Sequence, residues 1–425
     1  MGIREDARRM KLDAPALAAS SAEGRNRALE AVAEGLRANA DAIFAANAQD
    51  LAAADEAGVA APVKKRLRFD EGKLADVLGG IEQLVRLPDP LGAVTLDREL
   101  DEGLELRRVS VPIGVIGVIF EARPDALVQI STLCLKSGNC AILKGGKETA
   151  NTNRVLFGVI HDAAVAAGLP DACLVQAESH ADVDELLSCD GDVDLLIPRG
   201  SNAFVRYIMD HTKIPVMGHA DGVCNIYVDA DVDMDEALRV IIDAKCQYTA
   251  ACNAAECLLV NRAVADEFLP RLAAACAEAG VALRGSADVA AALGCEAMGD
   301  DEFGTEYLDL ILSVKLVDDV DEAIAHINRF GSHHTDAICT RDEAAAERFM
   351  RMVDSAGVYV NASTRFADGF RYGFGAEVGI STGKIHARGP VGLEGLVTYK
   401  YLLRGHGHIV ADYASGKRTF THRDL

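Results

Sequence analysis

The feature that most constrains the fold of this chain is a repeated alternation of short apolar runs with helical patterns. In the first half, the apolar runs IGVIGVIF (113–120), NCAILKGG (139–146) and VDLLIP (193–198) alternate with segments whose apolar residues recur at spacings of three and four. A second alternating set extends from VCNIYVD (223–229) to VYVN (358–361). Short apolar strands that alternate with helices are typical of parallel sheets covered by helices on both faces. The sequence therefore predicts an α/β protein with two doubly wound parallel-sheet domains.

These two sets also give the predicted domain boundaries. The first domain is expected to span residues 1–222 and to begin with a helical region rich in Ala, Glu, Arg and Leu. The second domain is expected to span residues 223–392, which leaves residues 393–425 as a C-terminal segment. Residues 94–112 contain two strand patterns on either side of the turn sequence DEG, which predicts a β-hairpin within the first domain.

Charge and cysteine content narrow the function classes. The formal net charge of −22 predicts that nucleic acids and anionic membrane surfaces are repelled, so we expect neither as a partner. No apolar run approaches the roughly 20 residues that span a bilayer, and the first residues, MGIREDARRMKLDAP, lack the apolar core of a secretory signal. The 11 cysteines have irregular spacing and include no CxxC pair, which predicts the reduced thiols of a cytoplasmic protein and no metal site.

One cysteine is distinguished by its predicted position. Cys246 lies at the end of a helical pattern and Cys257 lies within the strand pattern ECLLVN, so both are expected to be buried packing residues. Cys252 falls in the loop between them, next to Asn253 and several small residues. Loops on a rigid scaffold commonly carry reactive groups. Cys252 is therefore a candidate nucleophile, and the alternative, a small apolar residue that fills the core, stays open on position alone.

Eight runs taken together resemble the aldehyde dehydrogenase superfamily, and within it the gamma-glutamyl phosphate reductase family of proline biosynthesis. They occur in family order over nearly the whole chain: VPIGVIGVIFEARPDAL, SGNCAILKGGKE, DLLIPRGSNAFVR, GHADGVCNIYVD, CNAAECLLVN, TEYLDLILSVK, VYVNASTRFADG and EVGISTGKIHARGPVGLEGLVTYKY. The resemblance implies an aldehyde dehydrogenase-like fold with an NADP-binding domain (1–222) and a catalytic domain (223–392). It also implies that the hairpin (94–112) and the C-terminal segment (393–425) contribute to oligomerisation, and hence a homo-oligomer.

The resemblance implies a reaction as well. L-glutamyl 5-phosphate would be reduced by NADPH to L-glutamate 5-semialdehyde and phosphate, the second step of proline biosynthesis from glutamate, and association with glutamate 5-kinase, which makes the acyl phosphate, is a further hypothesis. The family's nucleophile falls on Cys252, whose thiolate would form a thioester that accepts hydride. Backbone N–H groups of Cys252 and Asn253 would stabilise charge on the carbonyl oxygen. Arg123, in FEARPD, lies near the position at which many relatives carry an asparagine that helps to stabilise this oxygen. Arg123 is therefore a candidate for substrate binding.

The run HADG (219–222) matches an ELGG-like run in hydrolytic relatives, with His219 in place of the glutamate that activates water. Loss of that base favours reduction of the thioester over its hydrolysis. His219 is a candidate for moving protons or binding phosphate, and a structural histidine is an equal alternative. A hydrolytic NAD(P)-dependent dehydrogenase of a small aldehyde is the alternative function, against which HADG counts. A non-catalytic member of the family is a third reading, against which the presence of Cys252, Glu306 and Lys144 counts.

The cofactor residues come from the resemblance, because the chain has no GxGxxG motif. Lys144 matches the lysine that meets the adenosine ribose, and Lys147 falls where NAD-preferring relatives often carry an acid, so a cation there would attract the 2′-phosphate of NADP. Gly200 and Ser201, the expected N-cap, precede a helix whose N-terminus can bind a pyrophosphate. Glu306 matches the glutamate that holds the nicotinamide ribose. For the lysines the alternative is a solvated surface, and for Glu306 it is an ordinary surface acid.

Basic residues gather in the run STGKIHARGP (381–390). Lys384, His386 and Arg388 are predicted to form an anion site for the phosphate or the α-carboxylate of the substrate. Arg365, in NASTRFADG, is a second candidate for substrate binding. Without the resemblance, the same run would be read as an exposed basic loop.

Overall fold

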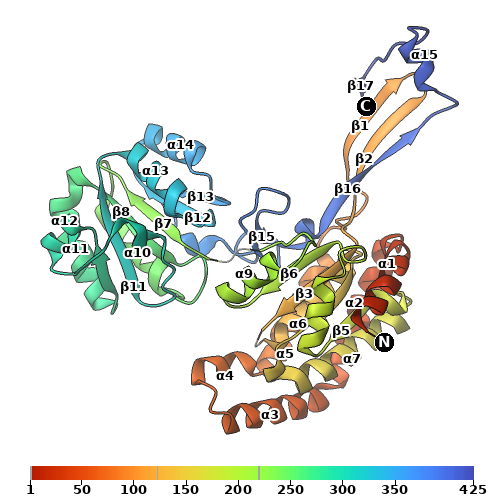
Figure 1. The fold of residues 1–425 in the computed structure, drawn as a ribbon, viewed down its shortest axis with the longest axis horizontal. Coiled ribbons are helices and arrows are strands. Elements are labelled where there is room, and N and C mark those ends of the chain that lie inside the picture. Colours follow the sequence, from red (N-terminus) through yellow and green to blue (C-terminus); the bar gives the residue numbers. More distant parts are fainter. Residues whose placement is uncertain (1, 122, 219–220) are drawn as a thin grey trace. The chain divides into compact units, whose positions relative to one another are not determined.

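The computed structural model describes residues 2–121, 123–218 and 221–425, and of residues 61, 62 and 180 it describes the backbone alone. The chain forms two compact units (Figure 1): the first comprises Met1–Met217 with Phe374–Gly379 and Val391–Leu425, and the second comprises Gly218–Gly373 with Ile380–Pro390. Among the described residues, no helix is both long and apolar enough to cross a membrane.

A four-stranded parallel sheet forms the centre of the first unit. Its strands lie in the order β5 (Leu174–Ala177), β4 (Cys140–Lys144), β3 (Val115–Phe120) and β6 (Leu195–Arg199). All residues of β3 and β4 are buried, as expected for strands that are covered on both faces. These two strands and β6 coincide with the three apolar runs of the first half, whereas β5 has four residues and no such run.

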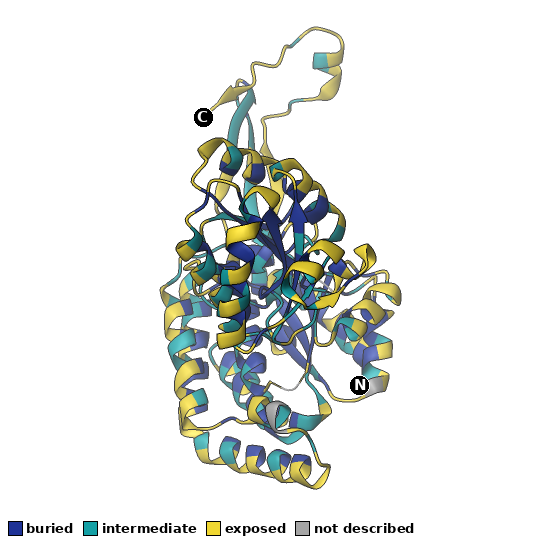
Figure 2. Ribbon diagram, turned by 90° about the vertical axis from the view of Figure 1, so that its left-hand side faces the viewer, coloured by how far each residue is buried: buried dark blue, intermediate teal, exposed yellow. Residues whose placement is uncertain are grey.

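Helices α1, α2 and α5 of the first unit have one buried and one exposed side (Figure 2), which follows from the spacing of their apolar residues, whereas α6 has no exposed residue. Asp70 begins α5 by accepting a hydrogen bond from the backbone N–H of Lys73. The helices are α1 (Ile3–Ala18), α2 (Ala22–Ala38), α3 (Ala40–Glu56), α4 (Ala61–Leu67), α5 (Glu71–Arg86), α6 (Pro124–Lys136), α7 (Ala150–Ala166), α8 (His180–Leu187) and α9 (Asn202–Asp210).

An antiparallel sheet also belongs to the first unit. Its order is β16 (Val397–Arg404), β2 (Leu104–Pro112), β1 (Val94–Asp101) and β17 (Arg423–Asp424), and α15 (Val410–Ala414) lies between β16 and β17 in the chain. The hairpin predicted over residues 94–112 is present as β1 and β2, joined by Glu102 and Gly103, whose positive φ of 73° a tight hairpin turn requires. β16 pairs with β2 along eight residues, so the C-terminal segment and the hairpin form one sheet.

A seven-stranded sheet forms the centre of the second unit. Each pair of neighbouring strands is parallel. The prediction of two doubly wound parallel-sheet domains is therefore confirmed. The strand order is β10 (Glu296–Ala297), β9 (Ala282–Gly285), β11 (Ile311–Val317), β8 (Ala255–Asn261), β7 (Cys224–Val228), β12 (Thr335–Cys339) and β13 (Gly357–Val360).

Helices cover both faces of this sheet. Side chains of β8 alternate between the two cores: Leu258 and Val260 belong to one, and Cys257 and Leu259 belong to the other. The first core includes residues of α10 (Met234–Cys246), α11 (Ala265–Glu278) and α12 (Ala287–Leu293), and the second includes residues of α13 (Val320–Phe330) and α14 (Glu343–Met352).

Candidate active site

Four residues of the second unit lie just before the amino ends of its strands. Gly222 precedes β7, Cys252 precedes β8, Glu306 precedes β11, and Asp354 precedes β13. Because all these strands are parallel, their amino ends meet at one edge of the sheet. Residues that are far apart in the sequence are thereby brought to the same side of the second unit.

Cys252 occupies the predicted position, in the loop between α10 and β8, and it is half-buried. The loop is held on several sides. The Asn253 side-chain amide donates to the carbonyl oxygen of Ala367 (2.8 Å), and the Thr364 hydroxyl donates to the carbonyl oxygen of Asn253 (2.6 Å). The Cys224 thiol lies 3.4 Å from the carbonyl oxygen of Cys252. The backbone at Cys252 and Asn253 is therefore fixed by neighbouring segments, as stabilisation of a developing charge by backbone N–H groups requires.

Gly222 packs directly against this loop. A Cβ atom added at Gly222 would lie 2.6 Å from the Cα and 2.7 Å from the Cβ of Cys252, which is closer than atoms can approach. Glycine at this position is thus required by the close approach of the two segments. Gly222, the last residue of the run HADG, therefore contacts the loop that carries Cys252. His219, the first residue of that run, lies outside the described residues, so the role of His219 stays a prediction.

Several other thiols are packing residues. Cys257, predicted to be buried, is 1% exposed, and Cys246 is half-buried and packs against the core beneath α10. Burial raises the pKa of these two thiols and therefore disfavours their reactive thiolate forms. Burial also raises the pKa of further thiols, to about 12 in Cys134, Cys140, Cys173, Cys276 and Cys339.

Cys257 and His326 form a contact that resembles a catalytic pair but cannot act as one. The Cys257 Sγ atom lies 3.8 Å from the Nε2 atom of His326, and both residues are buried. Burial raises the pKa of Cys257 and lowers that of His326 to about 4, so both groups are neutral near pH 7. Phe303 and Phe330 surround the imidazole ring and complete an apolar environment.

Arg365 is the basic residue that the structure associates with Cys252. It lies on a 3-10 turn (Thr364–Phe366), is 9% exposed, and its Nε atom donates to the Gln247 side-chain amide oxygen at 2.9 Å. Burial and the charge of Arg371 lower the pKa of Arg365, and the negative charge of a Cys252 thiolate opposes this effect. The guanidinium therefore supplies positive charge to the region of the candidate nucleophile.

In the predicted anion site, Lys384 and Arg388 form ion pairs with the carboxylate of Asp354 from the same chain. The Lys384 Nζ atom lies 2.5 Å from one carboxylate oxygen of Asp354, and the Arg388 Nη2 atom lies 3.4 Å from the other and donates to the Asp354 carbonyl oxygen at 2.9 Å. Hydrogen bonding and charge from Lys384 lower the pKa of Asp354. His386 is exposed on the same loop, which β14 (Gly379–Ser381) and β15 (Gly389–Val391) enclose. Asp354 was not among the predicted site residues, because it is distant from this loop in the sequence.

The candidate cofactor residues of the first unit lie at the carboxyl edge of its parallel sheet. Lys144 ends β4, is buried, and donates to the carbonyl oxygen of Gly145 at 2.6 Å; burial lowers its pKa. Lys147 is exposed on the turn that follows β4. Gly200 and Ser201 follow β6, and Ser201 is the N-cap residue of α9, although its side chain makes no capping hydrogen bond.

This arrangement fits a dinucleotide. The carboxyl edge of a doubly wound sheet is the usual ligand edge, and the backbone N–H groups at the start of α9 can bind a pyrophosphate. Arg123 lies at the same edge as the exposed residue before α6. Within the described part of the chain, no cluster of three His, Cys, Asp or Glu side chains has the arrangement of a metal site.

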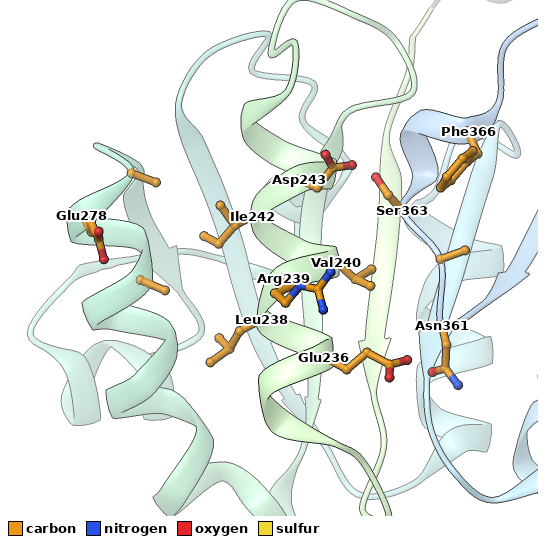
Figure 3. Close-up of a pocket in the computed structure, with 13 residues that line it drawn as sticks. Glu236, Leu238, Arg239, Val240, Ile242, Asp243, Glu278, Asn361, Ser363 and Phe366 are labelled. Carbon is orange, nitrogen blue, oxygen red and sulfur yellow. The ribbon is translucent and has the colours of Figure 1, made fainter. Parts of the chain in front are cut away.

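A surface pocket of about 1010 Å³ lies elsewhere in the second unit (Figure 3), on the outer side of α10. It includes Ser363 and Phe366, which flank Arg365 in the chain, but none of the predicted site residues lines it. Its charged side chains are Glu236, Asp243, Glu278 and a single cation, Arg239, an acidic balance that disfavours an acyl phosphate.

Comparison with known proteins gives the family. The family model described as the aldehyde dehydrogenase family matches residues 3–293. The chain belongs to the aldehyde dehydrogenase family. The gamma-glutamyl phosphate reductase of Ruminiclostridium cellulolyticum is 56% identical over 409 residues, 96% of this chain and 95% of that protein, and that of Pelotomaculum thermopropionicum is 54% identical over 425 residues, 100% and 98% of the two chains. The crystal structure of gamma-glutamyl phosphate reductase from Thermotoga maritima has 37% identity and a TM-score of 0.94, and the match covers 96% of this chain and 100% of that one.

These relatives confirm the resemblance drawn from the eight sequence runs and the aldehyde dehydrogenase-like fold class. The sequence placed Cys252 correctly in a loop between a helix and a strand. It did not identify the packing of Gly222 against Cys252 or the ion pairs of Asp354, because these contacts join segments that are distant in sequence.

Proposed function

We propose that this chain is an NADP-dependent glutamate-5-semialdehyde dehydrogenase of the phosphorylating type. It reduces L-glutamyl 5-phosphate with NADPH to L-glutamate 5-semialdehyde and phosphate in proline biosynthesis. The observation that carries the proposal is the Cys252 loop, which Gly222 packs against and which has the buried cation of Arg365 nearby. The names of relatives at 54–56% identity support the substrate.

The proposed chemistry begins at the sulfur of Cys252. The thiolate attacks the acyl carbon, the bond from that carbon to the phosphate oxygen breaks, and phosphate leaves with the electron pair. Backbone N–H groups at Cys252 and Asn253 stabilise the negative charge on the carbonyl oxygen. The resulting thioester keeps the acyl carbon electrophilic. When NADPH is bound, its nicotinamide supplies the hydride, and the thiolate of Cys252 is released as the aldehyde forms.

Residues of the first unit are proposed to hold the dinucleotide. Lys144 contacts the adenosine ribose, Lys147 attracts the 2′-phosphate, and Gly200 and Ser201 present the N-terminus of α9 to the pyrophosphate. In the second unit, Glu306 is proposed to hold the nicotinamide ribose. The domain roles proposed are cofactor binding for residues 1–222 and catalysis for residues 223–392.

Substrate anions are proposed to bind to the basic residues of the second unit, Arg365, Lys384, His386 and Arg388, and Arg123 is proposed to assist from the first unit. Lys384 and Arg388 must then exchange Asp354 for the phosphate or carboxylate of the substrate.

The antiparallel sheet is proposed as the oligomerisation element of a cytoplasmic homo-oligomer. β16 is exposed along its length and carries the large side chains of Tyr399, Tyr401, Leu402 and Leu403, which a second subunit would cover. Association with glutamate 5-kinase remains a hypothesis.

The decisive experiment follows NADPH formation from glutamate semialdehyde and phosphate, with NAD as the comparison cofactor. We expect turnover that requires phosphate and is lost in Cys252→Ala, while binding of NADPH to that variant persists. Oxidation of the semialdehyde at an equal rate without phosphate would instead identify a hydrolytic aldehyde dehydrogenase.

A further inference from the structure

The second unit contains a buried ion pair that flanks the nucleophile loop. Lys245 lies in the last turn of α10 and Glu256 lies in β8, so the loop that contains Cys252 connects the two residues. Their side chains are 0% and 1% exposed, and the Lys245 Nζ atom lies 2.6 Å from the Glu256 Oε2 atom. Burying two charges costs about as much as their attraction returns, so such a pair is weak evidence for a role in stability alone.

The second carboxylate oxygen of Glu256 reaches another segment of the candidate site. Its Oε1 atom accepts a hydrogen bond from the backbone N–H of Leu308 at 3.3 Å. Leu308 has a positive φ of 53°, so the chain bends sharply two residues after Glu306. Burial raises the pKa of Glu256 to about 7, the charge of Lys245 opposes this effect, and the charge of Glu306 adds to it. Glu256 therefore interacts both with the helix before the Cys252 loop and with the segment that carries Glu306.

We propose that the Lys245–Glu256 pair is a positioning element, which fixes the Cys252 loop and the Glu306 segment relative to each other. Lys245 and Glu256 do not touch the substrate. Glu256 fixes the start of β8 against the end of α10 with one oxygen and the bend at Leu308 with the other. This inference rests on the proposed function only in the roles given to Cys252 and Glu306.

The test compares three variants of the full-length protein. Lys245→Met combined with Glu256→Leu replaces the pair by apolar side chains, an exchange that is often neutral for stability. Glu256→Asp keeps the charge but is one methylene shorter, so it cannot reach both partners. Leu272→Ala removes a fully buried side chain of α11 from the core of the same unit and serves as a control that loses stability without changing the pair.

Four quantities are measured for each variant: the melting temperature, kcat, the dissociation constant of NADPH, and the rate at which iodoacetamide alkylates Cys252. We expect the apolar pair and Glu256→Asp to melt within a few degrees of the parent protein. Both should show a kcat lowered by roughly 10- to 100-fold, because a misplacement of about 1 Å has this effect. Their alkylation rate should change, and NADPH should bind several-fold more weakly. Leu272→Ala should melt at a lower temperature but keep all three site properties below its transition.

A folded apolar-pair variant with kcat and NADPH affinity within twofold of the parent would overturn the proposal. If that variant does not fold, parental values in Glu256→Asp overturn it equally. Alkylation and NADPH binding do not depend on the identity of the acyl phosphate. A parent protein without activity on glutamate semialdehyde would therefore refute the proposed function, while these two measurements would still decide the positioning role.

Discussion

Substitution of Gly222 by alanine tests the geometry of the nucleophile loop directly. The added Cβ would lie 2.6 Å from the Cα of Cys252, and 2.7 Å from its Cβ, whereas ordinary contact begins at about 3.4 Å. The carbonyl oxygen of Cys252 would lie closer still, so the two segments must separate by about 1 Å. A displacement of this size at a reacting atom costs about 10- to 100-fold in rate, and overpacking of a tight contact costs about 1–3 kcal/mol of stability.

The assay is the initial rate of NADPH formation from glutamate semialdehyde and phosphate, together with the melting temperature. We expect the kcat of Gly222→Ala to fall by about 10- to 100-fold. The dissociation constant of NADPH should change less, because Lys144, Lys147 and the start of α9 are not next to the substituted residue in the chain.

The matched control is Gly79→Ala in the interior of α5. No atom lies within 4 Å of the Cβ position at Gly79, and alanine is the better helix former by about 1 kcal/mol. This variant should keep the parental kcat and melt no lower than the parent. A Gly222→Ala protein with a kcat within twofold of the parent and an unchanged melting temperature would refute the close packing of Gly222 against Cys252.

Three further substitutions test other parts of the structure. Lys147→Glu should raise the KM for NADP about tenfold or more and leave that for NAD nearly unchanged, because a carboxylate repels the 2′-phosphate; steady-state rates with both dinucleotides decide this, and equal effects on both would contradict it. Asp354→Asn releases Lys384 and Arg388 from an exposed ion pair, which is worth up to about 1 kcal/mol. The KM for phosphate should therefore fall by up to about fivefold. A rise in this KM would contradict the anion site. Burial lowers the pKa of His326 from 6.5 to about 4. Between pH 6.5 and pH 4 the unfolded chain binds a proton at His326 that the folded chain does not. The free energy of unfolding therefore decreases by about 3 kcal/mol as the pH falls through this interval. His326→Leu should remove this loss, and urea unfolding of both proteins at pH 7 and pH 4.5 measures the difference.

The fold was largely predictable because its strands are local patterns. β3, β7 and β8 are short buried runs in which most residues are apolar, and such runs stand out against the spacing of three and four in the helices. The segment with β9, α12 and β10 was not predicted. β9 has four residues and β10 has two exposed ones, so neither contains enough apolar alternation to indicate a strand. Pairing with β11 in the folded sheet makes β9 a strand.

The candidate site was predictable only where its residues are neighbours in the chain. The position of Cys252 followed from the end of one helical pattern and the start of one strand pattern. Asp354 and Glu256 could not be assigned in this way, because their partners Lys384 and Leu308 lie about 30 and 50 residues away. A single sequence does not show which charged residues pair across a sheet edge. Of the residues predicted by resemblance, His219 is the one whose placement the structure does not describe.

The candidate residues next to the strands lie at opposite edges of the two parallel sheets, and this has an electrostatic consequence. In the first unit the candidate residues follow the strands and face helix N-termini, which attract anions. In the second unit Cys252 and Glu306 precede strands, at the edge where α10, α13 and α14 end, and helix C-termini carry a partial negative charge. Together with a net charge of −22, this edge would repel an acyl phosphate unless local cations compensated.

Arg365 supplies a compensating positive charge more directly than Lys384 and Arg388 do. Lys384 and Arg388 are paired with Asp354, whereas the Nε atom of Arg365 donates to the neutral amide of Gln247, so its positive charge is not cancelled by that hydrogen bond. Burial in a low-dielectric environment strengthens the field of that charge at the neighbouring Cys252. We therefore expect Arg365 to attract the proposed acyl phosphate to the sulfur, and the proposed binding by Lys384 and Arg388 requires them to exchange Asp354 for the substrate anion.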